Sequence, residues 1–291
     1  MFLQFFILSL LLVCFILFYF FYEIYTCKRV KEEPIKDNSF NTFGKANIFP
    51  LLNDKKWTKY VDKLEFKELC KQKGIKTFKT LQILNDPNDL YELHDTLPND
   101  FIIKSNTGSG QNYIVRNTKH LTPIEYEETI NKALHSLKNW KNPRYGEHEK
   151  QYNFTKPRLF VEELIDPIPD DIKIFIYQNI PTVMMIKDTS GTLKIYSYKI
   201  HKDYNITQMT DCFWKQNVEK QPSKTIEDIQ KKGKLKQMFE TVSKFKVDIP
   251  LVRIDLYWYR NDFYGGEVTL SSGNFGDKFN EICASQIFES L

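Results

Sequence analysis

The sequence predicts an α+β fold with antiparallel strands, preceded by one N-terminal transmembrane helix. Three observations carry this prediction. An uncharged apolar run opens the chain, short alternating strands cluster in its second half, and amphipathic helices separate the groups of strands. The 291 residues are 42% hydrophobic and 27% charged, which is ordinary for a globular domain once the apolar run is set aside.

The apolar run covers residues 1–22, and only Gln4 and Ser9 interrupt it. About 20 residues rising 1.5 Å each cross a hydrocarbon core of roughly 30 Å. A cleaved signal peptide is the alternative, but it requires a basic start, a shorter apolar stretch and a small-residue cleavage site, all of which this run lacks. We therefore expect residues 1–22 to anchor the protein in a membrane.

The charges and cysteines indicate the compartment. Lys28, Arg29 and Lys31 follow the apolar run, so the positive-inside rule places the C-terminal domain in the cytosol. The cysteines are Cys14, Cys27, Cys70, Cys212 and Cys283. Their wide spacing indicates neither a zinc site nor a disulfide framework, which fits a reducing compartment.

A net charge of +4, dispersed among acids, gives no reason to expect a nucleic-acid partner.

The remaining chain divides into a linker and one large domain. Residues 23–50 are polar and contain Pro34, Gly44 and Pro50, so we expect a linker there and a domain over residues 51–291. Helical periodicity is found over 57–74, 123–140 and 224–245. Strands are expected at 101–104, 113–116, 156–164, 171–178, 182–187, 193–198, 251–259 and 264–270.

A glycine-rich turn lies between the first two expected strands. Gly108, Ser109 and Gly110 form its centre, and glycines allow backbone N–H groups to approach phosphate oxygens. Lys104 precedes the turn and supplies a positive charge for phosphate. A strand follows instead of a helix, so this is not a P-loop. A plain hairpin turn is the alternative interpretation.

A second polar cluster follows at the end of the strand over 156–164. Glu162, Glu163 and Leu164 end that strand, and the next strand carries Asp171 and Lys173 on one face. Such an arrangement could hold adenine and ribose at the acidic strand end and phosphate at the lysine. A surface of mixed charge is the alternative.

The closing hairpin carries paired carboxylates. Alternation places Arg253 and Asp255 on one face of the first strand, and pairing through the turn brings Asp255 near Glu267, which shares its face with Thr269. Two adjacent carboxylates repel unless a cation lies between them, and Mg²⁺ is the expected cation. Arg253 could neutralise a phosphate or an acidic substrate. We expect the Gly265–Gly266 pair to keep the approach open; an exposed polar face is the alternative.

These elements occur in the order typical of the ATP-grasp superfamily, and the sequences of the motifs resemble those of the TupA-like ATP-grasp family. The matching stretches are 101–110, 151–164, 171–177, 252–257 and 265–273. The resemblance implies ATP bound in a cleft between two lobes that each contain an antiparallel sheet. It also implies roles for the following residues: Lys104 and Lys173 at phosphates, Glu162, Glu163 and Leu164 around adenine, and Asp255 and Glu267 as Mg²⁺ ligands.

The sequence departs from the family pattern at Thr269, where many ATP-grasp enzymes have Asn, which argues against a second metal ion. Ser105 and Thr107 also replace the Cys and His expected in the glycine-rich loop.

The resemblance implies an enzyme that uses Mg·ATP to activate a carboxylate or phosphorylate an acceptor, with Arg253 and Lys173 as catalytic cations. The acceptor would be a small molecule or a glycan precursor in polysaccharide or glycoconjugate biosynthesis, an expectation that depends on analogy. A glycosyltransferase of a surface-polysaccharide pathway and a degenerate, non-catalytic nucleotide-binding module are the alternatives.

Overall fold

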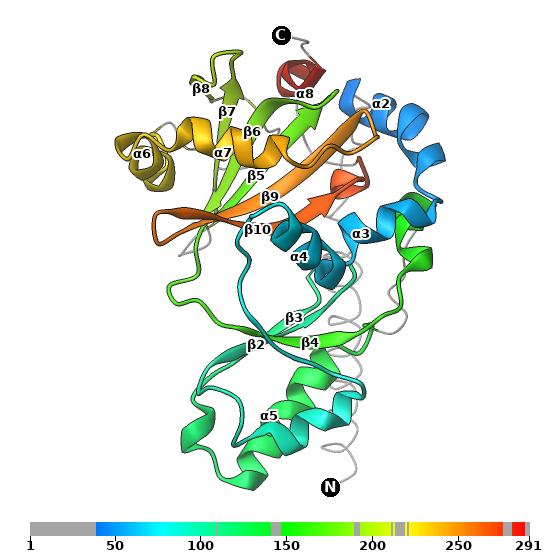
Figure 1. Cartoon of the computed structure of the whole chain (residues 1–291), viewed down its shortest axis with the longest axis vertical. Helices are drawn as coiled ribbons and strands as arrows, with labels where there is room; N and C mark the ends of the chain where they lie inside the picture. Colours follow the sequence, from blue (N-terminus) through cyan, green and yellow to red (C-terminus); the bar gives the residue numbers. More distant parts are fainter. Residues whose placement is uncertain are drawn as a thin grey trace, which may run out of the picture. The chain divides into compact units, whose positions relative to one another are not determined.

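The structure, a computed structural model, describes residues 39–108, 110–140, 147–188, 193–210, 212, 219, 221–275 and 281–288. The expected anchor over residues 1–22 lies outside this range. Across the described residues, no helix combines the length and the apolar character needed to cross a bilayer. The predicted α+β fold with antiparallel sheets is confirmed, because two such sheets are present (Figure 1).

The smaller sheet has four antiparallel strands in the order β1-β4-β2-β3. Its strands are β1 (Thr80–Ile83), β2 (Phe101–Ser105), β3 (Asn112–Val115) and β4 (Leu159–Glu163). Helix α5 (Pro123–Ser136) packs against it, and its start is fixed by a reciprocal capping box between Thr122 and Glu125. Ile103 and Val161 enter the core that this sheet shares with α5, where both are fully buried.

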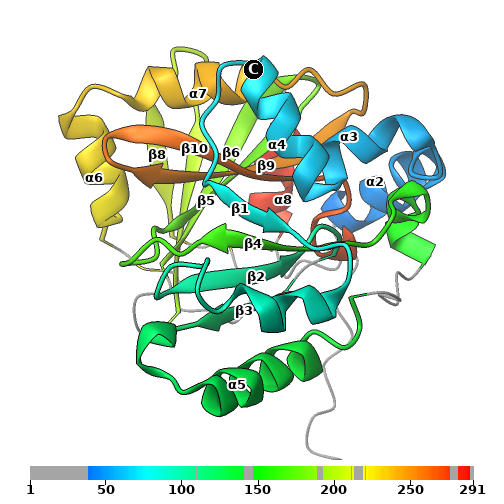
Figure 2. The same ribbon diagram turned by 60° about the horizontal axis from the view of Figure 1, so that its bottom comes forward.

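The larger sheet has six antiparallel strands in the order β10-β9-β5-β6-β7-β8. Its strands are β5 (Asp171–Tyr177), β6 (Ile180–Asp188), β7 (Lys194–Ile200), β8 (Ile206–Met209), β9 (Leu251–Tyr259) and β10 (Asp262–Thr269). The predicted alternation in β9 is confirmed, since Val252, Ile254 and Leu256 all enter the core. Figure 2 shows the two sheets as separate groups of strands.

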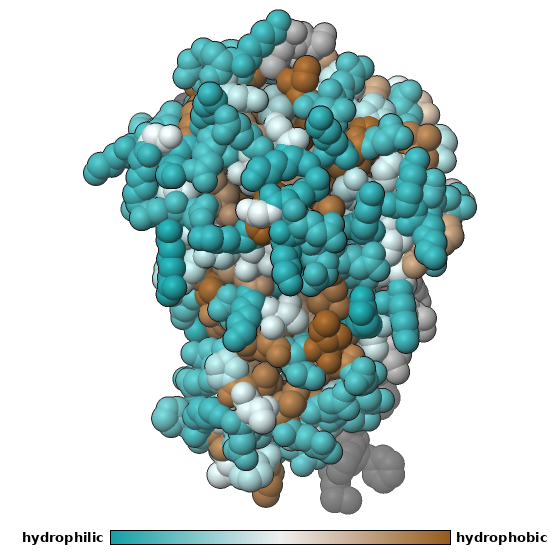
Figure 3. All heavy atoms as spheres, viewed as in Figure 1, coloured by the Kyte–Doolittle hydropathy of each residue, from teal (hydrophilic) through white to brown (hydrophobic). Residues whose placement is uncertain are grey.

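Helices pack around the larger sheet. They are α2 (Ser39–Asn47), α3 (Thr58–Val61), α4 (Lys63–Gln72), α6 (Lys224–Lys231), α7 (Leu235–Ser243) and α8 (Glu281–Phe288). Short 3₁₀ turns are η1 (Phe49–Leu51), η2 (Lys55–Trp57), η3 (Pro87–Leu93), η4 (Thr118–His120), η5 (Glu147–Phe154) and η6 (Ser272–Phe275). The face seen in Figure 3 is mostly hydrophilic, with hydrophobic side chains gathered over the smaller sheet.

Several expected boundaries differ from the structure. The helix expected over 57–74 is interrupted at Asp62, whose extended backbone and side chain cap α4. The helix expected over 224–245 is interrupted at Gly233, where φ is +65°. Helix α2 lies inside the range expected to be a linker, and its Phe40 is fully buried. Strand β8 was not predicted, because its sequence Ile-Thr-Gln-Met does not alternate apolar and polar residues.

The expectation of unpaired cysteines is wrong at two positions. Cys212 and Cys283 form a disulfide that ties α8 to a residue 71 positions earlier. Cys70 is free, and burial raises the pKa of its thiol to about 12. The cysteines therefore no longer support the expectation of a reducing compartment.

Candidate active site

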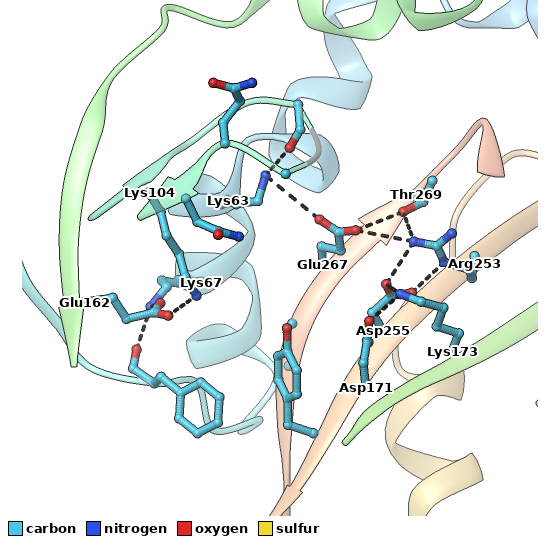
Figure 4. A pocket seen from close by; sticks show the side chains of 18 of the residues that line it. Lys63, Lys67, Lys104, Glu162, Asp171, Lys173, Arg253, Asp255, Glu267 and Thr269 are labelled. Carbon is cyan, nitrogen blue, oxygen red and sulfur yellow. Dashed lines mark hydrogen bonds and ion pairs between the residues drawn. The ribbon is translucent and has the colours of Figure 1, made fainter. Parts of the chain in front are cut away.

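A cavity of about 570 Å³ lies between the two sheets. Side chains from β2 and β4 line one side, and side chains from β5, β9 and β10 line the other (Figure 4). Helix α4 and the glycine-rich turn between β2 and β3 complete it. We call the first side, with Lys63, Lys67, Lys104 and Glu162, the lysine wall. We call the second, with Asp171, Lys173, Arg253, Asp255 and Glu267, the carboxylate wall.

The lysine wall is organised around Glu162. This residue lies opposite Ile102 in the β2–β4 ladder, so its side chain projects from the sheet face that also carries Lys104. Glu162 is almost completely buried and forms ion pairs with both Lys104 and Lys67. Burial alone would raise the pKa of Glu162, but the two ammonium groups lower it below its ordinary value.

Helix α4 contributes Lys63 and Lys67, which are four residues apart and therefore share one helix face. Asp62 fixes the start of the helix by accepting from the backbone N–H of Leu64 at 2.8 Å. Its other oxygen accepts from the Asn106 amide at 2.7 Å, which joins the helix start to the glycine-rich turn. The helix start and the turn therefore hold each other in position beside the cavity.

The glycine-rich turn has left-handed backbone at Gly108 and Gly110, with φ of 72° and 71°. Both glycines line the cavity, whereas Ser109 lies outside the described residues. The Gly108 carbonyl accepts a hydrogen bond of 2.6 Å from Lys63 Nζ, which also lies 3.8 Å from Glu267 Oε2. Lys63 thus connects the turn to the carboxylate wall, and burial lowers its pKa.

The carboxylate wall is centred on Asp255. Strand pairing places Lys173 on one side of Asp255 and Glu267 on the other, which confirms the predicted hairpin register. Lys173 Nζ donates to Asp255 at 2.6 Å and is 2.5 Å from Asp171. Arg253 donates to both oxygens of Asp255, at 2.7 and 2.8 Å, and to Glu267 at 3.3 Å. Its contact with Asp255 is therefore bidentate.

A β-bulge sets the direction of Glu267. The register shifts between Gly265 and Glu267, so Gly266 is the extra residue and Glu267 lies opposite Asp255. The expectation that these glycines keep the approach open needs correction for Gly265. A Cβ there would lie 2.7 Å from Cys70 Sγ, so this glycine is required for packing against α4.

The two aspartates of this wall have opposite pKa shifts. Burial raises the pKa of Asp255, but Arg253 and Lys173 outweigh burial and hold it below its ordinary value. Burial, with the neighbouring charge of Asp255, raises the pKa of Asp171 to about 6. Asp255 is therefore ionised across the neutral pH range, while Asp171 gains a proton in mildly acidic solution.

The donor set fits Mg²⁺ only in combination with phosphate oxygens. No cluster of three His, Cys, Asp or Glu side chains suited to a metal is found among the described residues. Mg²⁺ commonly takes one or two carboxylates and completes its shell with water and phosphate. Asp255 and Glu267 supply such a pair, and the buried Oδ1 of Asp171 has no hydrogen-bond partner in the described part of the chain.

The structure brings together most of the sequence-predicted residues. Those that line the cavity are Lys104, Gly108, Gly110, Glu162, Lys173, Arg253, Asp255 and Glu267. Glu163 and Leu164 are not among the lining residues. Strand alternation turns Glu163 away from Glu162, and its carboxylate accepts instead from the backbone N–H of Lys79 at 2.7 Å.

Sequence reasoning missed Lys63 and Lys67 as site residues. Two lysines four positions apart on an expected helix are a usable signal, because they share one face of that helix. It also missed the aromatic lining made by Phe78, Phe160 and Tyr257. Nothing in the local sequence indicated that these three rings converge.

The model of a family described as TupA-like ATPgrasp matches residues 52–287. No curated protein matches the chain.

Several solved structures are similar in fold. A D-alanine-D-alanine ligase from Helicobacter pylori matches with a TM-score of 0.45 and 17% identity, covering 80% of this chain and 61% of that one. An L-amino acid ligase from Bacillus licheniformis matches with a TM-score of 0.44 and 16% identity, covering 76% and 45%. A D-alanine–D-alanine ligase from Bacillus anthracis complexed with ATP gives 0.39 and 13%, covering 72% and 54%. The chain therefore spans less than two thirds of the length of each.

Proposed function

The chain belongs to the TupA-like ATP-grasp family, and from this premise we propose that it binds Mg·ATP and transfers the γ-phosphoryl group to an acceptor. The observation that carries the proposal is the opposition of the two walls across one cavity. Three lysines on one side suit a polyphosphate, and two adjacent carboxylates on the other suit a phosphate-bound Mg²⁺.

Each wall has a distinct part in the proposed reaction. Lys63, Lys67 and Lys104 contact the phosphates, and Glu162 keeps two of these ammonium groups in place before nucleotide arrives. Asp255 and Glu267 would hold Mg²⁺, which would supply charge neutralisation at the phosphates when bound.

The reaction class is phosphoryl transfer to a carboxylate oxygen. The bond between the γ-phosphorus and the oxygen of the leaving ADP breaks, and a bond to the acceptor oxygen forms, which gives an acyl phosphate. Arg253 and Lys173, both nearly buried on the carboxylate wall, stabilise the charge on the transferring group. An amine or thiol would then displace phosphate from the acyl phosphate. Phosphorylation of an acceptor hydroxyl is the related alternative.

The base would occupy the part of the cavity lined by aromatic rings. Phe78 lies 5.4 Å from Tyr257 between ring centroids, and both line the cavity together with Phe160. These rings contact each other, so a purine would pack against the surface that they present to the cavity, with the edge of β4 alongside. Glu162 is better placed for the lysines than for adenine, and we no longer assign Glu163 or Leu164 side chains to the base.

We further propose that residues 1–22 tether this domain to a membrane, with the domain on the cytosolic side. The apolar run and the basic residues Lys28, Arg29 and Lys31 support this. A tethered enzyme suits an acceptor carried by the membrane, such as a glycan precursor.

The test uses the full chain in detergent micelles. Binding of Mg·ATP is measured by calorimetry for wild type, Glu267→Gln and, as a matched control on the same hairpin, Asp262→Asn. Wild type and Asp262→Asn should bind, and Glu267→Gln should lose Mg²⁺-dependent binding at least tenfold. Absence of binding by wild type would remove the proposal.

The acyl phosphate is detected separately. Hydroxylamine is added to a reaction with ATP, Mg²⁺ and a panel of carboxylic acids, and hydroxamate formation is measured together with ADP. In a parallel reaction, nucleotide sugars replace ATP and transfer of the sugar is measured. Sugar transfer without ADP formation would favour a glycosyltransferase.

A non-catalytic nucleotide-binding module is the second candidate. It is favoured by the complete pairing of Asp255 with Arg253 and Lys173, which leaves this carboxylate neutralised without a metal ion. Mg·ATP binding without ADP formation for any acceptor would support it, and turnover that disappears in Glu267→Gln would exclude it.

A further inference from the structure

A small apolar hollow lies apart from the active site, on the side of the domain where the described chain begins. Its volume is about 460 Å³, and Leu51, Trp57, Val247, Ile249 and Pro250 supply its apolar lining. Leu51 and Ile180 are large apolar residues at or beside this hollow, yet they are 43% and 38% exposed.

These exposed side chains lie next to the first described helix. Helix α2 begins at Ser39 and continues through η1, which ends at Leu51. Phe43 of α2 packs against Tyr177 at 5.7 Å between ring centroids, and Tyr177 immediately precedes the turn that leads to Ile180. The turn residues Gln178 and Asn179 line the same hollow as Leu51.

Exposed lysines lie near the hollow that Leu51 lines, and Lys56 is one of its lining residues. Lys55, Lys56, Lys59 and Lys246 are all exposed. Lys59 lies beside Tyr60, whose hydroxyl donates to the Lys246 carbonyl at 3.2 Å, so these lysines belong to one neighbourhood. The acids nearby are Asp54 and Asp248, and both lie within 4 Å of Lys56. We call Leu51, Ile180, Lys55, Lys56, Lys59 and Lys246 the tether-side face.

The length of chain between the expected anchor and α2 limits how far the tether-side face can lie from the membrane. Residues 23–38 separate the expected anchor from Ser39. Sixteen extended residues span at most about 55 Å. Such a short connection keeps the domain at a high effective concentration beside the bilayer, so a weak surface interaction suffices to orient it.

We propose that the tether-side face rests on an anionic membrane surface, with Leu51 and Ile180 among the lipid headgroups and the four lysines near lipid phosphates. The inference depends on the membrane tether proposed above. It adds an orientation, because the domain would lie on the bilayer through one defined face instead of rotating freely on its linker.

Exposure alone does not identify this face. Ile124 is 71% exposed and is the most exposed large apolar residue of the described chain. It lies at the start of α5 among Glu125, Glu127 and Glu128, which an anionic surface repels. Ile124 is therefore a stringent control, because it is apolar and more exposed than Leu51 or Ile180 but lies among charges of the opposite sign.

The experiment uses the full chain in proteoliposomes that contain a quencher lipid, with either 30% phosphatidylserine or only zwitterionic lipid. Leu51→Cys, Ile180→Cys and Ile124→Cys are labelled with a small fluorophore, and the signal of identically labelled parent protein is subtracted. We expect quenching at positions 51 and 180 at least twofold above that at 124, only with anionic lipid. The substitution pair Lys55→Glu and Lys56→Glu in Leu51→Cys should abolish the difference.

Equal quenching at positions 51 and 124, or quenching that does not depend on anionic lipid, would overturn the docking proposal. Vesicle flotation, read on the same samples, tests the tether separately. Chain that floats without quenching at position 51 retains the tether and loses the docking face, whereas chain that does not float loses both. Thermal melting of each labelled variant checks that the domain is folded.

Discussion

The two walls of the cavity solve opposite electrostatic problems. On the lysine wall, Glu162 pairs with Lys67 and Lys104 and so compensates the repulsion between these two ammonium groups. On the carboxylate wall, three carboxylates lie close together, and the two cations Arg253 and Lys173 compensate the repulsion between them. Each wall therefore carries an excess of the charge that its proposed ligand neutralises, phosphate on one side and Mg²⁺ on the other.

The comparison shows that buried ion pairs can hold mobile side chains on one wall and a rigid cluster on the other. The lysine wall is built on a helix and a small sheet, so its ammonium groups are on flexible stems that can turn toward a ligand. The carboxylate wall is built on three adjacent strands, and its central Asp255 is only 2% exposed. Substitutions on the carboxylate wall should therefore affect folding as well as function, and those on the lysine wall mainly binding.

The largest effect is expected for Asp255. Asp255→Ala leaves Arg253 and Lys173 buried without their partner, which should lower the free energy of unfolding by about 3–5 kcal/mol. The isosteric Asp255→Asn should reduce ATP turnover by about 100-fold or more. Urea unfolding and ADP release measure the two effects, with Asp262→Asn as the control. Full turnover in Asp255→Asn would contradict the role of this wall.

On the lysine wall, Lys104→Ala should weaken ATP binding by about 10- to 100-fold, the loss expected for one charge-assisted hydrogen bond. Unfolding should change little, because Glu162 retains its pair with Lys67. Calorimetry and urea unfolding separate the two, and Lys132→Ala on the exposed face of α5 is the control. If Lys104→Ala lowered the free energy of unfolding but left ATP affinity unchanged, the proposed division, in which the lysine wall serves mainly binding, would be wrong.

Asp171 on the carboxylate wall and Glu162 on the lysine wall should contribute oppositely to stability as pH changes. The pKa of Asp171 is raised to about 6 in the folded protein, so the folded state holds a proton that the unfolded state has lost. Its contribution to stability therefore falls as pH rises from about 4 to about 6, by up to about 3 kcal/mol. The pKa of Glu162 is lowered, so its contribution is present above its unfolded pKa and is lost as pH falls.

Urea unfolding between pH 4 and 7.5 measures both slopes. Asp171→Asn should remove the loss of stability with rising pH, whereas Glu162→Gln should flatten the acid side of the curve. Identical pH profiles for the two variants would contradict the opposite pKa shifts of Asp171 and Glu162.

The sequence predicted the carboxylate wall more fully than the lysine wall. Arg253, Asp255 and Glu267 are close because two neighbouring strands pair through a short turn, and such pairing can be read from alternation. Lys63 and Lys67 reach the cavity only because Asp62 breaks a continuous helix and binds Asn106, a contact between residues 44 positions apart. The break, the bulge at Gly266 and the Cys212–Cys283 pair all depend on tertiary contacts, which local periodicity does not contain.

The smallest effect is expected where α4 packs against β10, at the contact between Cys70 and Gly265. Gly265→Ala places a Cβ 2.7 Å from Cys70 Sγ, so α4 must shift on β10 at a cost of about 1–3 kcal/mol. Cys70→Ala should relieve that clash, and a double-mutant cycle by urea unfolding should give a favourable coupling between the two changes. Gly266→Ala is the contrast, because its Cβ would meet the Asp255 carbonyl and the Tyr257 ring, which Cys70→Ala leaves in place. Rescue of both variants by Cys70→Ala would show that α4 is not packed specifically against Gly265.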